Sequence, residues 1–227
     1  MRDQRGHLPR LAVTRHLHPS DYRVMPWKNG KGTTTELAVG YAPGDASREG
    51  ARFAWRLSLA ELPETGPFSD FAGYERTILM VEGPVGGGGM TLDFGPHGRT
   101  VVDRPFEPVG FSGDWATHCR LHGGPIRDLN LMVARELARA EVEVLRLGGD
   151  AVERTATREG SGDLLLCYGL AGDAELTLDG GTPQRLARHE TLLVQGDGAN
   201  CPALSASIGD SGGEAVLFLA WISLRQS

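Results

Sequence analysis

Arg56 and Ser58 stand on one face of a predicted strand over residues 52–62. Alternation in RFAWRLSLAEL divides this strand into an apolar face with two aromatic residues and a face of small residues that carries Arg56 and Ser58. If the apolar face packs against protein, Arg56 points into the interior of a small β-barrel. A buried guanidinium is costly unless it is paired, so it needs an anionic ligand or a carboxylate partner, Glu36 or Asp128.

A second predicted strand, in the segment DLNLM, has the same polar character. Asp128, Asn130 and Met132 share one face, whereas leucines occupy the other face. Taken alone, this strand fits a sheet edge with one face in water or a strand that lines a polar cavity. Because two strands carry inward polar residues, we favour the cavity.

The segment MPWKNGKGTTTELAV is predicted to be a loop that runs into a strand. In the loop, Trp27 offers an aromatic wall, Lys28 a positive charge, and Asn29 a hydrogen-bond donor and acceptor. Glu36 follows on the strand, on the same face as Thr34. This arrangement suits the rim of a pocket, although Lys28 taken alone is typical of a solvated surface lysine.

Another segment, GPFSDFAGYERTILMVEG, places Phe68 and Phe71 in a Gly- and Pro-containing loop before a strand that starts near Arg76. Aromatic residues in such loops usually cover the mouth or the core of a barrel, and they can also line a pocket. These two roles are compatible.

The motifs of several other chemistries are missing. The only His-x-His spacing, His16–His18, lies outside both copies of the internal repeat, and His118 and His122 are about 13 Å apart along a strand. There is no GxSxG elbow, P-loop or dinucleotide fingerprint. We therefore expect no metal, no cofactor and no catalytic nucleophile.

The composition is that of a globular chain with a core. The 227 residues are 40% hydrophobic and 23% charged, with a formal net charge of −6 and a pI of about 5.6, so a nucleic-acid footprint is absent. Cys119, Cys167 and Cys201 are widely spaced and are expected to be free thiols in a reducing compartment. No signal-like or membrane-length apolar run occurs, which predicts a cytoplasmic protein that does not enter a membrane.

Period-2 alternation bounded by turn residues predicts an all-β chain, with at most one helical turn near Ala134–Ala140. An internal repeat accompanies it. GMTLDFG aligns with AELTLDGG, and Asp93 and Asp179 are 86 residues apart, as are Gly83 and Gly169. This period suits a duplicated small barrel or jelly roll. We predict an N-terminal domain over 10–135 that holds the candidate pocket and a C-terminal domain over 136–227, packed as one body.

Four segments together resemble the HutD/Ves family: MPWKNGKGTTTELAV, FAWRLSLAEL, GPFSDFAGYERTILMVEG and RDLNLMVAR, in that order. The resemblance implies a duplicated cupin (bicupin) fold without the usual metal ligands, and a link to histidine utilisation. It also implies binding of a small carboxylate metabolite such as urocanate or formylglutamate. Carried onto this chain, the motif positions are Trp27, Lys28, Asn29, Glu36, Arg56, Ser58, Phe68, Arg76, Asp128 and Asn130.

Three functions remain open from the sequence. The favoured one is a non-enzymatic accessory or regulatory protein whose N-terminal barrel binds a small anionic metabolite, with Arg56 contacting its carboxylate. The alternative is a metal-independent lyase, isomerase or hydrolase in which Glu36 or Asp128 acts as general acid or base. A third is a scaffold whose second barrel binds another protein. Exposed edge strands could also pair between two copies of the chain, so the sequence is compatible with a homodimer.

Overall fold

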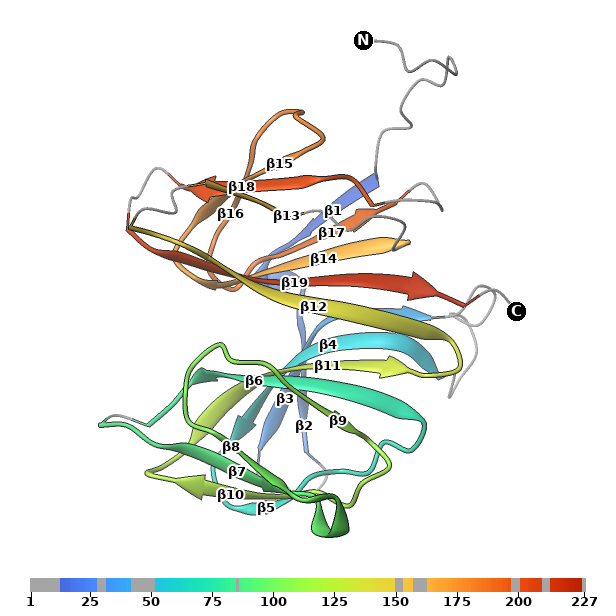
Figure 1. The fold of residues 1–227 in the computed structure, drawn as a ribbon, viewed down its shortest axis with the longest axis vertical. Helices are drawn as coiled ribbons and strands as arrows, with labels where there is room; N and C mark the ends of the chain where they lie inside the picture. The colour runs from blue at the N-terminus through green and yellow to red at the C-terminus, as the bar shows by residue number, and fades with distance from the viewer. Residues whose placement is uncertain are drawn as a thin grey trace. The chain divides into compact units, whose positions relative to one another are not determined.

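The computed structural model describes residues 13–27, 32–41, 52–84, 86–149, 153–156, 163–196, 201–209 and 213–225. Their regular structure consists of strands, β1 to β19, and two short 3-10 helices, Pro19–Asp21 and Gly95–His97 (Figure 1). Within these ranges, no helix has the length and apolar character needed to cross a membrane.

The chain divides into two compact units. The N-terminal unit comprises Leu17–Ala140 with Leu224–Ser227, and the C-terminal unit comprises Met1–His16 with Glu141–Ser223. The predicted division follows residue 135, and the two units meet between Ala140 and Glu141. The predicted domain over 10–135 differs at its start, because β1 (Val13–Leu17) joins the sheet of the C-terminal unit.

The N-terminal unit contains a six-stranded sheet in the order β2-β3-β4-β11-β6-β9 and a four-stranded sheet in the order β5-β10-β7-β8. The strands of the larger sheet are β2 (Arg23–Pro26), β3 (Thr33–Tyr41), β4 (Phe53–Leu62), β6 (Tyr74–Glu82), β9 (Val109–Ser112) and β11 (Ile126–Ala134). Those of the smaller sheet are β5 (Gly66–Pro67), β7 (Gly89–Asp93), β8 (Arg99–Val102) and β10 (His118–His122).

The C-terminal unit contains a five-stranded sheet in the order β1-β17-β14-β19-β12 and a four-stranded sheet in the order β13-β18-β15-β16. The larger sheet adds β12 (Ala138–Leu147), β14 (Leu164–Ala171), β17 (Thr191–Gln195) and β19 (Ala215–Leu224) to β1. The smaller sheet is formed by β13 (Glu153–Ala156), β15 (Ala174–Leu178), β16 (Gln184–Leu186) and β18 (Leu204–Ile208).

Both units are built on one plan. The order β4-β11-β6-β9 corresponds to β12-β19-β14-β17, and β5-β10-β7-β8 corresponds to β13-β18-β15-β16. The repeated segments GMTLDFG and AELTLDGG fall on the equivalent strands β7 and β15 and the turns that follow them. Two four-stranded layers in this order form the jelly roll of cupins. The predicted all-β, duplicated cupin fold is therefore confirmed.

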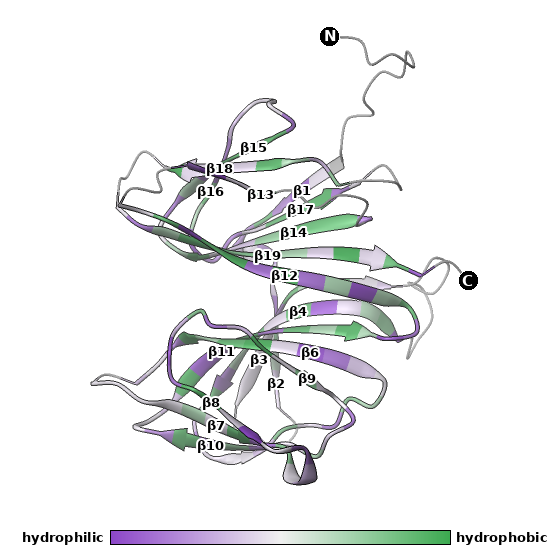
Figure 2. Cartoon of the chain, viewed as in Figure 1, coloured by the Kyte–Doolittle hydropathy of each residue, from purple (hydrophilic) through white to green (hydrophobic). Residues whose placement is uncertain are grey.

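The interiors of the two units differ in polarity. In the C-terminal unit Thr191 is the one buried polar residue among those described, and an apolar cluster extends from Leu145 on β12 to Trp221 on β19. In the N-terminal unit an apolar cluster that includes Ile78 and Met80 occupies part of the interior, but Arg76 and Asp128 are also buried there. Figure 2 shows purple bands on β4 and β6, the strands that carry Arg56 and Arg76. The polar interior of the N-terminal unit is the place to look for a site.

The predicted helical turn near Ala134–Ala140 is wrong. Residues 135–137 form a tight turn, in which the backbone N–H of Leu137 donates to the carbonyl of Ala134 at 3.0 Å, and β12 begins at Ala138. One i to i+3 hydrogen bond between two strands closes a turn without starting a helix.

Candidate functional site

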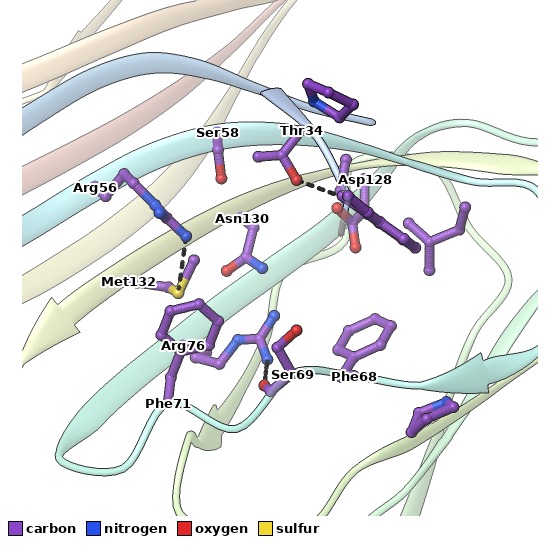
Figure 3. Close-up of a pocket in the computed structure, with 15 residues that line it drawn as sticks. Thr34, Arg56, Ser58, Phe68, Ser69, Phe71, Arg76, Asp128, Asn130 and Met132 are labelled. Carbon is purple, nitrogen blue, oxygen red and sulfur yellow. Dashed lines mark hydrogen bonds between the residues drawn. The ribbon is translucent and has the colours of Figure 1, made fainter. Parts of the chain in front are cut away.

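A cavity of about 510 Å³ lies inside the N-terminal unit (Figure 3). Its walls come from the β2–β3 hairpin, from the interior faces of β4, β6 and β11, and from the segment around β5. The lining residues are Pro26, Trp27, Thr34, Arg56, Ser58, Ala60, Leu62, Pro67, Phe68, Ser69, Phe71, Arg76, Asp128, Asn130 and Met132.

Strand register arranges the polar side chains of this cavity in rows. Directly opposed residues of antiparallel strands share one face. Arg56 on β4 is opposite Met132 on β11, which is opposite Arg76 on β6, so the two arginines share one row. In the second row Ser58 is opposite Asn130, and in the third Ala60 is opposite Asp128. The cavity therefore changes along β11 from cationic, through neutral and polar, to acidic.

Arg76 is buried, with 6% of its surface exposed. Its guanidinium lies 5.0 Å from the ring centres of Phe68 and Phe111 and 5.5 Å from that of Phe71. Nη1 of Arg76 donates a hydrogen bond to the Ser69 carbonyl at 3.4 Å. Burial lowers the pKa of Arg76 to about 10. The negative charge of Asp128 acts against this shift, whereas the positive charge of Arg56 lowers the pKa further. Arg76 is therefore a cation at neutral pH without a close anion among the described residues.

Arg56 is the second cation of the row. It lies 4.8 Å from the ring centre of Phe53 and 5.4 Å from that of Phe71, and its Nη2 is 3.9 Å from the sulfur of Met132. Burial lowers the pKa of Arg56, and the charges of Glu36, Tyr74 and Tyr41 act against this shift. A thioether is a weak acceptor, so the contact leaves most of the guanidinium free to bind an anion.

Asp128 has 1% of its surface exposed. Burial raises the pKa of Asp128 to about 7, against the lowering effects of the Arg76 charge and a hydrogen bond from the backbone N–H of Ala60. Near neutral pH this carboxyl group is therefore divided between its acid and its carboxylate. It can act as a hydrogen-bond donor in the first form and as an acceptor in the second.

Within the described residues, buried side-chain atoms that lack a hydrogen-bond partner all belong to this cavity. They are Nε of Arg56, Nε of Arg76, Oδ1 of Asp128 and Oδ1 of Asn130. Folded proteins satisfy nearly all buried polar groups, because an unsatisfied one costs about 1–3 kcal/mol. Four such atoms in one cavity, two of them donors and two acceptors, indicate a candidate binding site for a polar ligand.

Trp27 forms one wall of the cavity and is fixed by the hairpin that carries it. Its indole N–H donates to the Thr34 hydroxyl at 2.9 Å, and its backbone N–H donates to the Gly32 carbonyl at 2.9 Å. A Cβ atom on Gly32 would lie 2.7 Å from the Glu61 carbonyl and 2.9 Å from the Trp27 ring. The Gly residue is therefore required for the ring to lie where it does.

We expect Gly32→Ala to displace the Trp27 ring and to destabilise the fold by roughly 1–3 kcal/mol, because the added methyl group overpacks this contact. Urea unfolding followed by circular dichroism measures the loss. Gly66→Ala is a matched control, because a Cβ atom there meets nothing within 4 Å. Equal stability of the two variants would show that the hairpin adapts without cost.

The segment 66–71 brings two phenylalanines to the opposite wall. The backbone N–H of Phe68 donates to the Thr117 carbonyl at 2.9 Å, and that of Phe71 donates to the Gly113 carbonyl at 3.1 Å. These bonds hold the loop close to Arg76, so its aromatic rings face the guanidinium. The cavity therefore combines cations with flat apolar surfaces.

Most of the residues predicted from the sequence meet in this cavity. Those that line it are Trp27, Arg56, Ser58, Phe68, Arg76, Asp128 and Asn130. Lys28 and Asn29 lie outside the described residues. Glu36 does not line the cavity, although it is opposite Ser58 and its charge acts on Arg56. Ser69 and Pro67 were not predicted, because nothing in a loop sequence fixes which residues face inward.

Metal binding and thiol chemistry have little support in this cavity. Its described lining contains one carboxylate, Asp128, and no imidazole, whereas a cupin metal centre needs several converging imidazoles. Cys119 lies near Asp128, and burial raises the pKa of its thiol to about 12. A thiol with this pKa is almost entirely protonated at neutral pH and is a poor nucleophile.

Comparison with known proteins places the chain in a family. A Pseudomonas putida protein described as an uncharacterised 21.2 kDa protein in the hutC 3′ region is 34% identical over 181 residues, which cover 80% of this chain and 86% of that protein. Protein Ves of Citrobacter koseri is 33% identical over 186 residues, which cover 78% of this chain and 88% of that protein.

A solved structure extends the comparison to three dimensions. HutD from Pseudomonas fluorescens SBW25, described with a formate condition, matches with a TM-score of 0.70 and 30% identity, covering 94% of this chain and 100% of that chain. The family model described as HutD matches residues 19–209, a span that includes every lining residue of the cavity. The chain belongs to the HutD family.

Proposed function

We propose that the protein is a non-enzymatic binding protein for a small carboxylate metabolite, held in the cavity of the N-terminal unit. The single observation that carries this proposal is the row of two guanidinium groups, the buried Arg76 and the partly buried Arg56, with no ion-pair partner among the described residues. Figure 3 shows both groups directed toward the region of Asn130. An anion bound between them would replace the missing partners.

Urocanate and formylglutamate are the first candidates, because the chain belongs to the HutD family and a relative is described by its place in a hut region. Urocanate carries one carboxylate for the arginine row, and formylglutamate carries two. The flat walls formed by Trp27 and Phe68 suit the conjugated ring of urocanate. Formate, named in the description of the related Pseudomonas fluorescens structure, is the simplest probe of the same chemistry.

A ligand-dependent thermal shift with the Arg56→Ala variant tests the proposal. Ligand at about a hundred times its dissociation constant adds nearly 3 kcal/mol to the unfolding free energy of the wild-type protein. We expect Arg56→Ala to fold but to bind at least about tenfold more weakly, because it loses a charge-assisted contact.

The matched control is Arg120→Ala, which removes the same charge from an exposed position of β10 outside the cavity. It should keep the wild-type shift. Unchanged affinity in Arg56→Ala would remove Arg56 from the site, and the absence of a shift with every carboxylate would overturn the proposal.

One observation favours an enzyme as the second candidate. The pKa of Asp128, raised to about 7 by burial, is well suited to general acid–base catalysis at neutral pH. Of the two carboxylates proposed for this role, only Asp128 lines the cavity. NMR spectra of urocanate and formylglutamate incubated with the protein decide the matter: consumption by the wild type but not by Asp128→Asn would replace the binding function with a catalytic one.

A further inference from the structure

The cavity has two arginines at one end and an aspartate, Asp128, at the other. Met132, in the arginine row, and Asp128 are four residues apart on β11, which corresponds to about 13 Å between their Cα atoms. The arginine side chains extend into part of this interval, and Asn130 lies halfway along it. The cavity of about 510 Å³ has room for a small acid, whose two ends would lie in different surroundings if it lay along the strand.

The two ends need different chemical groups. At the arginine row, Nε of Arg56 and Nε of Arg76 are unpaired donors, which need an acceptor and favour an anion. At the other end, Oδ1 of Asp128 has no donor, although the carboxyl group also interacts with the backbone N–H of Ala60. An acceptor placed at this end would leave the Asp128 oxygen without a donor.

The groups that face Asp128 do not supply this donor. Arg76 on β6 attracts the carboxylate of Asp128. In the described part of the chain, however, no hydrogen bond joins these two residues. On the smaller sheet, Cys119 of β10 lies near Asp128, and its thiol contacts the sulfur of Met90 at 3.7 Å. The indole N–H of Trp27 already donates to the Thr34 hydroxyl. When Asp128 is ionised, a ligand with an N–H group would supply the donor that its Oδ1 lacks among the described residues.

We propose that the ligand binds in one orientation, with its carboxylate at the Arg56–Arg76 row and an N–H group donating to Asp128. This inference rests on the proposed binding function and narrows the ligand class to flat or amide-containing monocarboxylic acids with an N–H group at the far end. Of the two candidates named above, urocanate fits this class, whereas formylglutamate, with two carboxylates, does not. A second carboxylate at that end would meet the charge of Asp128. Asp128 is then the residue that selects among acids, and the arginines bind them all.

Two ring compounds that differ by one atom test the inference directly. 3-(Pyrrol-2-yl)acrylate carries a ring N–H, and 3-(2-furyl)acrylate has an oxygen acceptor in its place, and neither ring titrates near neutral pH. Calorimetric titration at about pH 8, where Asp128 is largely ionised, should show that the pyrrole acid binds at least about tenfold more tightly. Glutarate, with two carboxylates, should bind more weakly than the pyrrole acid.

Asp128→Asn provides the second measurement. An asparagine amide can donate to the furan oxygen or accept from the pyrrole N–H, so we expect the preference to fall to within about threefold. Equal binding of the two ring acids by the wild-type protein, or tighter binding of glutarate, would overturn the orientation and leave carboxylate binding intact. Binding of none of the three acids would overturn both proposals. The comparison of ligands on the wild type does not depend on the folding of any variant.

Discussion

Arg76→Met is expected to lose carboxylate binding while the folded protein becomes at least as stable as the wild type. Arg76 is almost fully buried, and its Nε has no hydrogen-bond partner. Apolar side chains of similar volume in place of a buried ion pair are often neutral or stabilising by about 1–4 kcal/mol. Arg76 forms no ion pair with a described residue, so Arg76→Met leaves no carboxylate that has lost a hydrogen-bonded partner. The affinity should fall at least about thirtyfold, because a buried contact between a cation and a carboxylate contributes roughly 2–5 kcal/mol.

Urea unfolding and calorimetric titration with urocanate measure the two effects on the same samples. Arg120→Met, an exposed change on β10, is the matched control and should leave both quantities near their wild-type values. The opposite pattern, a large loss of stability with affinity preserved, would show that the Arg76 guanidinium supports the aromatic rings around it rather than a ligand.

Asp128→Asn is expected to change the dependence of stability on pH. Burial raises the pKa of Asp128 in the folded protein to about 7, from an ordinary value of 3.8. The folded state therefore holds this proton more tightly than the unfolded state, and stability falls as the pH rises from about 4 to about 7. A difference of about three pKa units corresponds to roughly 4 kcal/mol, all of it lost above pH 7. Asparagine does not titrate, so the variant lacks this loss.

Unfolding free energies measured at about pH 5, 6, 7 and 8 should show the wild type losing stability relative to the variant from pH 5 to about pH 7, with the difference levelling off by pH 8. Asp103→Asn, an exposed substitution, controls for the change in net charge. A gap that stays constant with pH would mean that Asp128 has the same protonation state throughout, and the change in stability would then reflect packing alone.

The alternation of side chains along β4 and β11 allowed much of the site to be predicted from the sequence. Arg56, Ser58, Asp128 and Asn130 were expected to face the interior, and each lines the cavity. This success has a physical reason: which face a strand residue occupies depends on its immediate neighbours in the chain. The duplicated fold was equally accessible, because the repeat is present in the sequence itself.

The alignment of the two arginines could not be predicted in this way, because it depends on register. In the pairing of β11 with β6, Arg127 is opposite Glu82, but Asp128 is opposite Met80, so Val81 is passed over. This bulge shifts the rest of β6 by one residue, and without it Arg76 would not be opposite Met132. A second register shift follows Glu36 on β3, where pairing with β4 resumes at Ala38. Neither irregularity has a signature in the sequence.

The place of β1 in the fold has a consequence for synthesis on the ribosome. β1 is the first described strand to emerge, but its neighbour β17 is among the last. The strands of the larger sheet in the N-terminal unit, β2 to β11, are complete long before that. The cavity can therefore form while the nascent chain still carries an unpaired β1, and closing so distant a pairing is slow. Until β17 has been synthesised, β1 therefore has no partner strand in the sheet to which it belongs.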